Sequence, residues 1–418
     1  MFRYKQTAGT GLKLSMKLFF INLNMYQFMK TKSLLLVATA AMTMASCSQN
    51  EIVETNPDAN RAIGFGVYTG TQTKGLVTDN SLTDGATANG LKVAGKGFGI
   101  LAYQTDGNYS TSGAKGLFMD NVQTTWTAGA PSGSWGYSPT KFWPTNTTDK
   151  ISFFAYAPFN AGATTGIPTG TNKIKVTGAT GSEDPLLEFT LQDNQKDMVD
   201  LVVSNVKDQQ STTAGGKVTF AFKHALTRVA MHAKTSVATN AETKVYITGI
   251  KLKHTKKLAQ KATFDMNDAT WELPATTPGS DYLAAEYAIA ATSANGVLKL
   301  ANPTWKGYTT PAVEINSAVV NLFTDDQYLF FIPIDGTTGT GAASDVVAAI
   351  SYDIVSLPSS GATTAVASSF TKEVDLGANV FAKGKAYKFT FTITLNAITV
   401  DVDDFDWDTE TNKPVTVN

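Results

Sequence analysis

Apolar and polar residues alternate without interruption over residues 387–395. Each odd position in this run holds an aromatic or branched apolar residue, and each even position holds lysine or threonine. Side chains of a β-strand point alternately to its two faces, so this pattern predicts a strand with one buried face. Similar short runs recur along the chain, separated by clusters of Gly, Asn, Asp, Ser and Thr. This spacing is typical of an all-β sandwich protein.

The other strands predicted from such runs are short and rich in β-branched and aromatic residues. They are residues 61–68, 97–103, 198–203, 217–222, 245–252, 328–334, 346–355 and 398–407. In the first of them, Gly64 and Gly66 would leave one face open to the close approach of another backbone. Residues 223–234 remain open between helix and strand, because their apolar spacing also fits one face of a helix.

The run over residues 398–407 changes phase near its middle. Its apolar residues fall into two alternations: Ile398, Val400 and Val402 in one, and Phe405 and Trp407 in the other. A β-bulge inserts one extra residue into a strand, so a bulge at Asp403–Asp404 would bring all five side chains to one face. The intervening aspartates lack the glycine and the distal glutamate of a calcium-binding EF-hand loop. They predict a solvated strand face.

Residues 29–47 have the layout of an export signal. Lys30 and Lys32 precede an uncharged run that extends from Leu34 to Ser46, and the single cysteine of the chain, Cys47, follows. A basic head, an apolar run of about 7–15 residues and small residues at the cleavage position describe a secretory signal peptide. The run is too short to cross a bilayer, which requires about 20 apolar residues.

The residues before Cys47 match a bacterial lipobox, with Met44 three places upstream and Ala45 and Ser46 next to the cleavage position. We expect cleavage before Cys47, a diacylglycerol on its thiol and acylation of the new amino group. Several acyl chains give stable anchoring where one gives marginal binding. The alternative is that Cys47 is an ordinary buried thiol in an N-terminal helix. Residues 1–28 are basic and contain no acid, and we interpret them as the result of a misassigned start codon.

Charge and composition exclude several functions for the remainder of the chain. Six of the 34 lysines and arginines and none of the 35 acidic residues lie in residues 1–46, so residues 47–418 carry 28 basic and 35 acidic residues, a net charge of about −7. Nucleic-acid binding requires clustered Lys and Arg, so this balance argues against a nucleic-acid partner. With no cysteine after Cys47, no disulfide framework is available.

Composition also suggests a domain organisation. A polar segment, residues 47–61, is predicted to be a lipid-anchored tether after the signal peptide, residues 1–46. The low-complexity bridge at residues 209–216 predicts a boundary between an N-terminal β-sandwich, residues 62–215, and a C-terminal β-sandwich, residues 216–418. The length is long for one sandwich and suits two.

No pattern of catalytic or metal-binding residues emerges. His224, His232 and His254 lack the spacing of a zinc site, and the alternating glycines at positions 95, 97 and 99 precede no helix, so they do not form a phosphate loop. The chain contains no Gly-x-Ser-x-Gly. We therefore expect no enzyme activity, catalytic residue, metal or cofactor. The aromatic block at residues 135–156 remains open between a sugar-binding platform and core packing.

Several short motifs of this chain recur together in one protein family. They are Cys-Ser-x-x-Glu at residues 47–51, Ile63-x-Phe65 followed by Thr73-Lys74, Phe-Phe-Ala-Tyr-x-Pro at residues 153–158, Asp-Leu-Val-Val-Ser at residues 200–204, Phe-x-His-Ala-Leu-x-Arg-Val at residues 222–229 and a terminal strand ending in Trp407. Because it has these motifs in this order, the chain resembles the fimbrillin-like family, the lipoprotein subunits of type V pili in Bacteroidia-type bacteria. The resemblance covers nearly all of the chain after the signal peptide.

The resemblance implies two transthyretin-like β-sandwiches in tandem and a particular route of assembly. The subunit would cross to the outer membrane as a lipoprotein, and an arginine- or lysine-specific protease would then remove the lipid together with the first strand. A C-terminal strand of another subunit would fill the groove left open, since an added strand satisfies the unpaired backbone groups of a sheet edge.

Residues of this chain match the parts of that assembly. The removable strand would contain Ile63, Phe65 and Val67, and the cleavage would follow Lys74, where the family more often has arginine. Arg61 is an alternative cleavage position, although a cut there would leave the strand in place. The donor strand would come from residues 398–407 or from the tail after them.

Two classes of function follow as hypotheses. The first is a structural subunit of a surface pilus that serves adhesion or biofilm formation; its partners would be other pilin subunits, the outer membrane through its lipid, a maturation protease and a host or glycan receptor. The second is a non-polymerising surface lipoprotein that binds a glycan or a host protein and retains its first strand. A glycan-degrading lipoprotein is a third and more distant reading.

Overall fold

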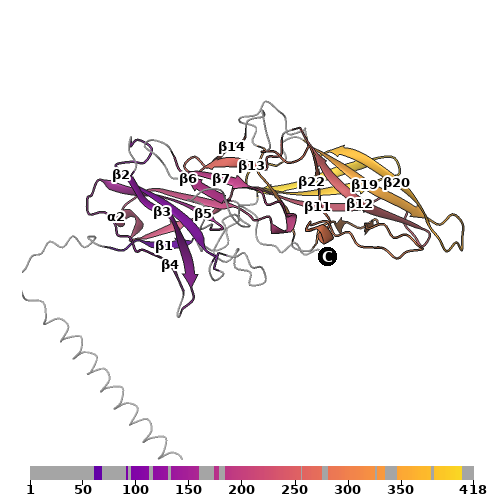
Figure 1. Cartoon of the computed structure of the whole chain (residues 1–418), viewed down its shortest axis with the longest axis horizontal. Helices are drawn as coiled ribbons and strands as arrows, with labels where there is room; N and C mark the ends of the chain where they lie inside the picture. The colour runs from indigo at the N-terminus through magenta and orange to yellow at the C-terminus, as the bar shows by residue number, and fades with distance from the viewer. Residues whose placement is uncertain are drawn as a thin grey trace, which may run out of the picture. The chain divides into compact units, whose positions relative to one another are not determined.

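The computed structural model describes residues 61–67, 91–92, 96–112, 116–129, 133–159, 174–177, 184–255, 257–274, 281–324, 327–334, 346–377 and 381–406. Strands dominate these ranges, and the helical elements within them are short (Figure 1). Among these residues, no helix combines the length and the hydropathy that would let it span a membrane. The prediction of an all-β protein is confirmed.

The first group of strands runs from residue 64 to residue 224. It comprises β1 (Gly64–Val67), β2 (Phe98–Asp106), β3 (Gly116–Thr127), β4 (Ser134–Tyr137), β5 (Asp149–Ala157), β6 (Ile174–Thr177), β7 (Leu186–Thr190), β8 (Val202–Gln209), β9 (Lys217–Phe220) and β10 (Lys223–His224). The 3-10 helix η1 (Gln195–Asp197) precedes β8, and the short helix α2 (Ser211–Ala214) connects β8 to β9.

The second group continues to residue 406. It comprises β11 (Thr227–Thr235), β12 (Thr243–Lys253), β13 (Lys261–Asp265), β14 (Thr270–Glu272), β15 (Glu286–Ala288), β16 (Val313–Ile315), β17 (Val320–Asn321), β18 (Leu329–Phe331), β19 (Val347–Ser356), β20 (Val366–Asp375), β21 (Lys385–Ile393) and β22 (Ile398–Asp406). The 3-10 helix η2 (Thr292–Ala294) lies between β15 and β16.

The N-terminal strands form a central antiparallel sheet in the order β10-β8-β5-β2-β3-β4. Side chains on one of its faces pack against the parallel pair β1–β9, and those on the other face pack against the sheet β14-β13-β7-β6. This arrangement explains β5, in which every residue from Ile151 to Ala157 is buried. A strand covered on both faces reads as a continuous apolar run instead of an alternating one.

Two hydrophobic clusters lie on the two faces of this central sheet. The cluster under the β1–β9 pair, called here the β1-side core, contains residues of β2 and β5 such as Ile100 and Phe153 together with Val218 and Phe220 of β9. On the opposite face, Phe154 belongs to a larger cluster that continues into the C-terminal strands. Alternate residues of each strand point to opposite faces, so the same strands contribute side chains to both clusters.

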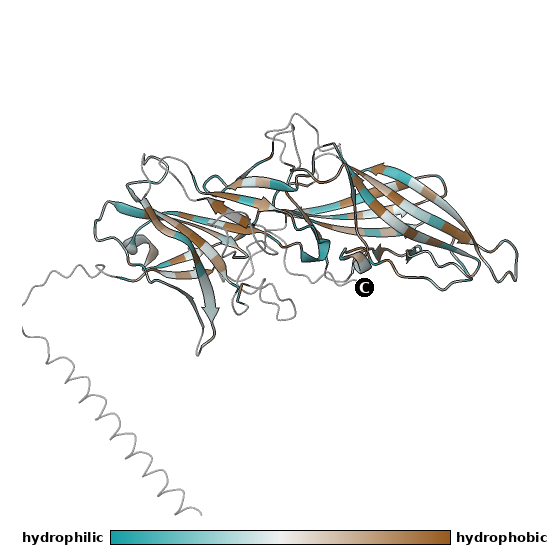
Figure 2. Ribbon diagram, viewed as in Figure 1, coloured by the Kyte–Doolittle hydropathy of each residue, from teal (hydrophilic) through white to brown (hydrophobic). Residues whose placement is uncertain are grey.

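The C-terminal strands form two further sheets. One has the order β17-β11-β21-β22 with β18 also on β11, and the other has the order β15-β12-β19-β20 with β16 also on β12. Apolar side chains from the two sheets, such as Phe391 of β21 and Ile350 of β19, belong to the same buried cluster. Brown and teal residues alternate along these strands in Figure 2, as expected where one face of each sheet is buried.

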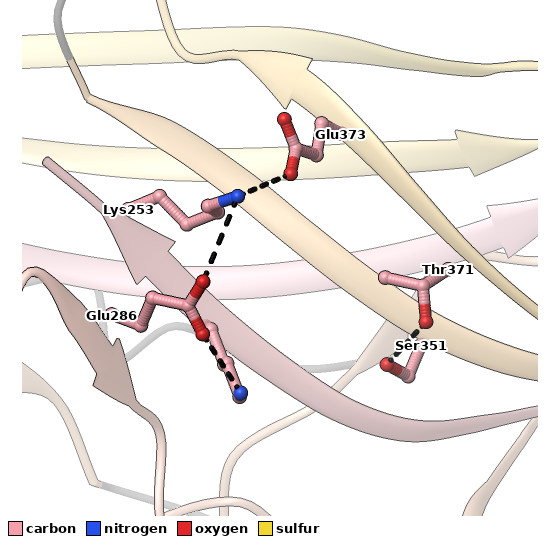
Figure 3. A network of polar contacts seen from close by, with 6 residues as sticks. Lys253, Glu286, Ser351, Thr371 and Glu373 are labelled. Carbon is pink, nitrogen blue, oxygen red and sulfur yellow. Dashed lines mark hydrogen bonds and ion pairs between the residues drawn. The ribbon is translucent and has the colours of Figure 1, made fainter.

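The outer face of the sheet β15-β12-β19-β20 carries a polar network (Figure 3). Lys253 Nζ of β12 lies 2.6 Å from Glu373 Oε1 of β20 and 3.7 Å from Glu286 Oε1 of β15. Lys251 Nζ lies 3.0 Å from Glu286 Oε2, and Lys251 and Lys253 together lower the pKa of Glu286. Charges in this arrangement mark a solvent-facing surface and not a buried catalytic site.

Residues 223–234, which the sequence left open, form strands. Val229, Met231 and Ala233 of β11 are buried, and the strand pairs in parallel with β21 over eight register positions. The apolar residues of this segment fit both a helical spacing and the period of two of a strand. Pairing with β21 selects the strand. The predicted strand at residues 387–395 ends earlier, since β21 stops at Ile393 and Leu395 is 64% exposed.

The predicted bulge at Asp403–Asp404 is wrong. β22 pairs with β21 in a continuous antiparallel register from Ile393↔Ile398 to Lys385↔Asp406. In this register Asp404 lies opposite Tyr387 and Phe405 lies opposite Ala386. Successive residues therefore continue to point to alternate faces, with no extra residue at the aspartates. Exposed carboxylates are tolerated on both faces at this point because β22 is an edge strand.

The boundary predicted between residues 215 and 216 is crossed by strand pairing. β9 lies after that boundary but pairs with β1, and β13 pairs with β7. Residues Pro57–Asn418 form one compact unit. The division into two transthyretin-like sandwiches remains a prediction.

Candidate strand-exchange site

β1 and the residue before it provide three apolar side chains to the β1-side core. Ile63, Phe65 and Val67 are 2%, 3% and 5% exposed. They share a face because alternate residues of a strand point the same way. Burial of each such side chain stabilises a fold by about 1.5–3 kcal/mol, so β1 contributes substantially to this core although it is only four residues long.

Aromatic rings surround Phe65 on three sides. Its ring centroid lies 4.9 Å from that of Tyr137, 5.6 Å from that of Phe153 and 5.7 Å from that of Phe220. Phe153 belongs to the central sheet and Phe220 to β9, so Phe65 connects the two layers. Aromatic pairs at these separations contribute about 0.5–1.5 kcal/mol beyond their area burial.

The backbone of β1 is held mainly along one edge. β1 pairs in parallel with β9, from Gly64↔Lys217 to Val67↔Phe220. The sheet that they form has only these two strands among the residues that the structure describes. On the other side, contacts lie at the start of the strand, where Tyr137 Oη donates to Ile63 O at 2.9 Å and Ile63 N donates to Lys141 O at 2.9 Å.

The outer face of β1 is formed by Gly64 and Gly66, as the sequence predicted. A Cβ atom at position 66 would lie 2.5 Å from Lys217 Cε, and one at position 64 would lie 3.5 Å from Gly216 O. The glycines therefore admit the backbone of Gly216 and the side chain of Lys217. One face of β1 is thus apolar and buried. The other face consists of two glycines and is covered by the flexible side chain of Lys217.

β22, the expected donor strand, occupies the edge of its own sheet. Among the strands that the structure describes, it pairs with β21 only. Ile398 is 9% exposed, whereas Val400 and Val402 are half-buried against the large cluster. Asp403 Oδ2 lies 2.6 Å from Lys388 Nζ, and both side chains are exposed, so this ion pair contributes about 0–1 kcal/mol. β22 therefore combines an apolar face with an open backbone edge.

The remaining predicted site residues are distributed differently. Cys47, Lys74 and Trp407 lie outside the described residues, and the side chain of Phe405 does as well. Arg61 is exposed immediately before β1, and its carbonyl oxygen accepts a hydrogen bond from Trp143 N at 3.0 Å. The lipidation and maturation assignments remain predictions.

The three histidines lie apart in separate environments. Nδ1 of His224 lies 2.6 Å from Asp200 Oδ2, whereas His232 and His254 are buried in β11 and after β12. Among the described residues, no group of three or more His, Cys, Asp or Glu side chains could hold a metal ion.

Buried histidines make stability depend on pH. Burial is the main cause that lowers the pKa of His232 and of His254 below 6.5. The unfolded chain then binds more protons than the folded chain once the pH falls below about 6.5, so the stabilisation is complete above that pH and is lost as the pH falls toward the folded pKa.

We therefore expect the Tm to fall between about pH 7.5 and about pH 5, and to fall less in a variant with His232→Gln and His254→Gln. Thermal unfolding followed by circular dichroism at the two pH values measures this difference. An equal loss of Tm in the parent and in the double variant would contradict the assignment.

Most of the aromatic block belongs to the core. Trp143, Phe153, Phe154 and Tyr156 are each at most 2% exposed. Phe142 is 48% exposed. Core packing is therefore the reading that the structure supports for most of the block.

The partners of β1 were not recognised from the sequence. The alternation of Val218, Phe220 and Phe222 predicted a strand, but nothing local connects it with Ile63, Phe65 and Val67. The only available signal was that both short runs alternate apolar residues with small or polar ones, so that each has one apolar face. Parallel pairing between distant segments depends on the tertiary fold.

Layered sheets, a short first strand over an apolar core and an edge strand near residue 400 define an all-β protein made of packed sheets. A family model described as "Fimbrillin-like" matches residues 86–407. Because the match spans most of the chain, this protein belongs to the fimbrillin-like family.

Two relatives agree with this membership. The fimbrium subunit Fim1C of Phocaeicola vulgatus is 36% identical over 374 residues, which is 86% of this chain and 92% of that protein. The crystal structure of a fimbrial protein from Bacteroides vulgatus has a TM-score of 0.69 and 31% identity, and the similarity covers 83% of this chain and 100% of that one.

Proposed function

We propose that this protein is a structural subunit of a cell-surface pilus that polymerises by strand exchange. The observation that supports this most directly is the segment of residues 63–67. Its three buried apolar side chains lie on β1 and on the residue before it, and β1 pairs with a single neighbour among the described strands. Loss of β1 would leave the β1-side core covered by β9 alone. A groove with alternating apolar pockets and an unpaired β9 edge accepts an extended strand from another subunit.

β22 or the residues after it would supply that strand. β22 already has the needed character, because its apolar side chains alternate on one face and its outer edge is open. Adding a strand in register replaces both the backbone hydrogen bonds and the buried side chains that β1 provided. Export as a lipoprotein on Cys47, and delivery to the outer membrane, would bring subunits to the surface where cleavage starts assembly.

Cleavage after Lys74 is expected to convert the monomer into oligomers. The protein for this test is the chain from residue 47 with Cys47→Ser, which contains the compact unit Pro57–Asn418. An arginine- and lysine-specific protease is added for increasing times. N-terminal sequencing then identifies the cut, and size-exclusion chromatography measures the assembly state.

The matched control is Lys74→Ala, which should stay monomeric under the same conditions, while Arg61→Ala should behave like the parent. A parent that is cut after Lys74 and sheds β1 but stays monomeric would contradict strand exchange. That result would favour a surface lipoprotein that binds a glycan or a host protein without polymerising.

A further inference from the structure

A cavity of about 360 Å³ opens beside β8, at an edge of the central sheet. Residues of β8, β9 and β10 line it together with residues of β13 and of two turns, one containing Ala269 and the other Gly384. Its volume lies within the range of about 300–1,000 Å³ that is common for ligand pockets. The cavity is separate from the β1 groove, because Thr219 and Ala221 line it while Phe220 and Phe222 point into the β1-side core.

The wall formed by β8 contains an open sheet edge. β8 pairs with β5, but β10 reaches only Val202 and Val203 on the other side. From Ser204 to Val206, no described strand pairs with β8 on the side away from β5. All three of these residues line the cavity. An extended chain placed here can add to β8 and satisfy its free backbone donors and acceptors.

The lining also has an excess of positive charge. It contains Lys223, Lys383 and His224, and none of the residues that form it is Asp or Glu. The charge of His224, when protonated, is matched by Asp200, whose Oδ2 lies 2.6 Å from Nδ1. Lys383 Nζ donates to Ala269 O, which is an uncharged partner. Neither lysine has an ion-pair partner among the described residues, so a ligand with carboxylates would be favoured.

Apolar residues complete the site. Val203, Phe264 and Met266 line the cavity and are each less than 9% exposed. A strand that adds to β8 would direct alternate side chains toward this apolar surface and toward the lysines. The site therefore suits a chain in which apolar and acidic residues alternate.

We propose that this cavity binds an extended acidic peptide of a partner protein, which adds to β8 between Ser204 and Val206 and places carboxylates at Lys223 and Lys383. The open backbone edge favours a peptide over an acidic sugar, because a sugar has no main-chain groups to pair with it. The site is complete while β1 is in place, so the binding does not depend on strand exchange.

A fluorescein-labelled peptide with the sequence of residues 398–406 is a suitable probe, because it alternates aspartates with Val and Phe. We expect saturable binding to the uncleaved chain from residue 47 with Cys47→Ser, measured by fluorescence polarisation at low ionic strength. Lys223→Glu should weaken the affinity about tenfold, since it replaces an attraction by a repulsion. Lys372→Glu, which reverses an exposed charge on β20 away from the cavity, should leave the affinity within about twofold.

Two further measurements test the main chain and the cavity itself. A probe with N-methyl groups on alternate residues should bind at least about tenfold more weakly, because it cannot donate to β8. Ala221→Trp should fill the cavity and prevent binding, with an unchanged Tm showing that the fold is intact.

Three results would overturn the proposal. They are the absence of saturable binding by the probe, equal binding of a probe with Asn in place of Asp, and equal binding of the N-methylated probe. If N-acetylneuraminic acid displaces the probe while N-methylation has no effect, the cavity is an acidic-sugar site instead. If the parent protein stays monomeric after cleavage following Lys74 while the probe still binds, strand exchange is overturned and this site is supported.

Discussion

Replacing Phe65 with alanine is expected to lower the free energy of unfolding of the uncleaved protein by about 3–5 kcal/mol. The side chain is 3% exposed and lies between the rings of Tyr137, Phe153 and Phe220. The substitution removes these contacts and leaves a cavity that the rigid central sheet cannot fill. Urea unfolding followed by tryptophan fluorescence measures the loss.

Phe142→Ala is the matched control for this prediction. Phe142 lies beside the start of β1, where it forms an isolated bridge with Ala62, but its side chain is 48% exposed. Surface substitutions of this kind change stability by about 0.5 kcal/mol or less. The prediction is contradicted if Phe65→Ala lowers the free energy of unfolding by no more than Phe142→Ala does. In that case β1 would contribute little to stability, and the groove beneath it would have little affinity for a replacement strand.

Locking β1 to β9 with a disulfide is expected to abolish oligomer formation while leaving proteolysis unchanged. Gly66 and Thr219 are register partners, and a Cβ atom at position 66 would lie 3.6 Å from Thr219 Oγ1. The Oγ1 position approximates that of the sulfur of a cysteine at position 219, so a cysteine at position 66 lies within reach of it. Lys217 Cε would have to move, which a flexible side chain allows.

The variant with Gly66→Cys and Thr219→Cys is made in the Cys47→Ser background, which contains no other cysteine. After cleavage following Lys74, the oxidised protein should remain a monomer and the reduced protein should form oligomers. Mass spectrometry confirms the disulfide, and the single variant Thr219→Cys should form oligomers under both conditions. Oligomers of the oxidised protein, with the disulfide intact, would show that assembly proceeds without release of β1.

Local alternation was sufficient to predict several strands, such as β12, β19 and β21, but not others, such as β3 and β20. In β21, Tyr387, Phe389, Phe391 and Ile393 are buried, as their period of two predicted. The same reasoning failed where the position of a segment in its sheet decides whether it is a helix or a strand, or whether a strand is bulged or regular. Residues 227–235 became a strand because β21 pairs with them along their length, and β22 stayed regular through its aspartates because an edge strand tolerates charge on either face.

The candidate site was predictable only in part. The residues of β1 and β22 could be chosen from their alternation, whereas the residues that receive β1 could not. Val218 and Phe220 are far from Phe65 in the sequence, and no local property of either run specifies a parallel pair between them. The cavity beside β8 gave no signal either, since its lysines, Lys223 and Lys383, meet only in the folded chain.

The sequence by itself determined that this protein is made of β-strands, because side-chain alternation is a local property that each strand carries alone. It also indicated, through a series of short motifs and their order along the chain, membership of a family of fimbrial subunits. Only the tertiary structure decided that β1 covers a core with one neighbour and that β8 has an open edge. Both depend on which distant strands pair, and pairing is determined by the packing of whole layers against one another.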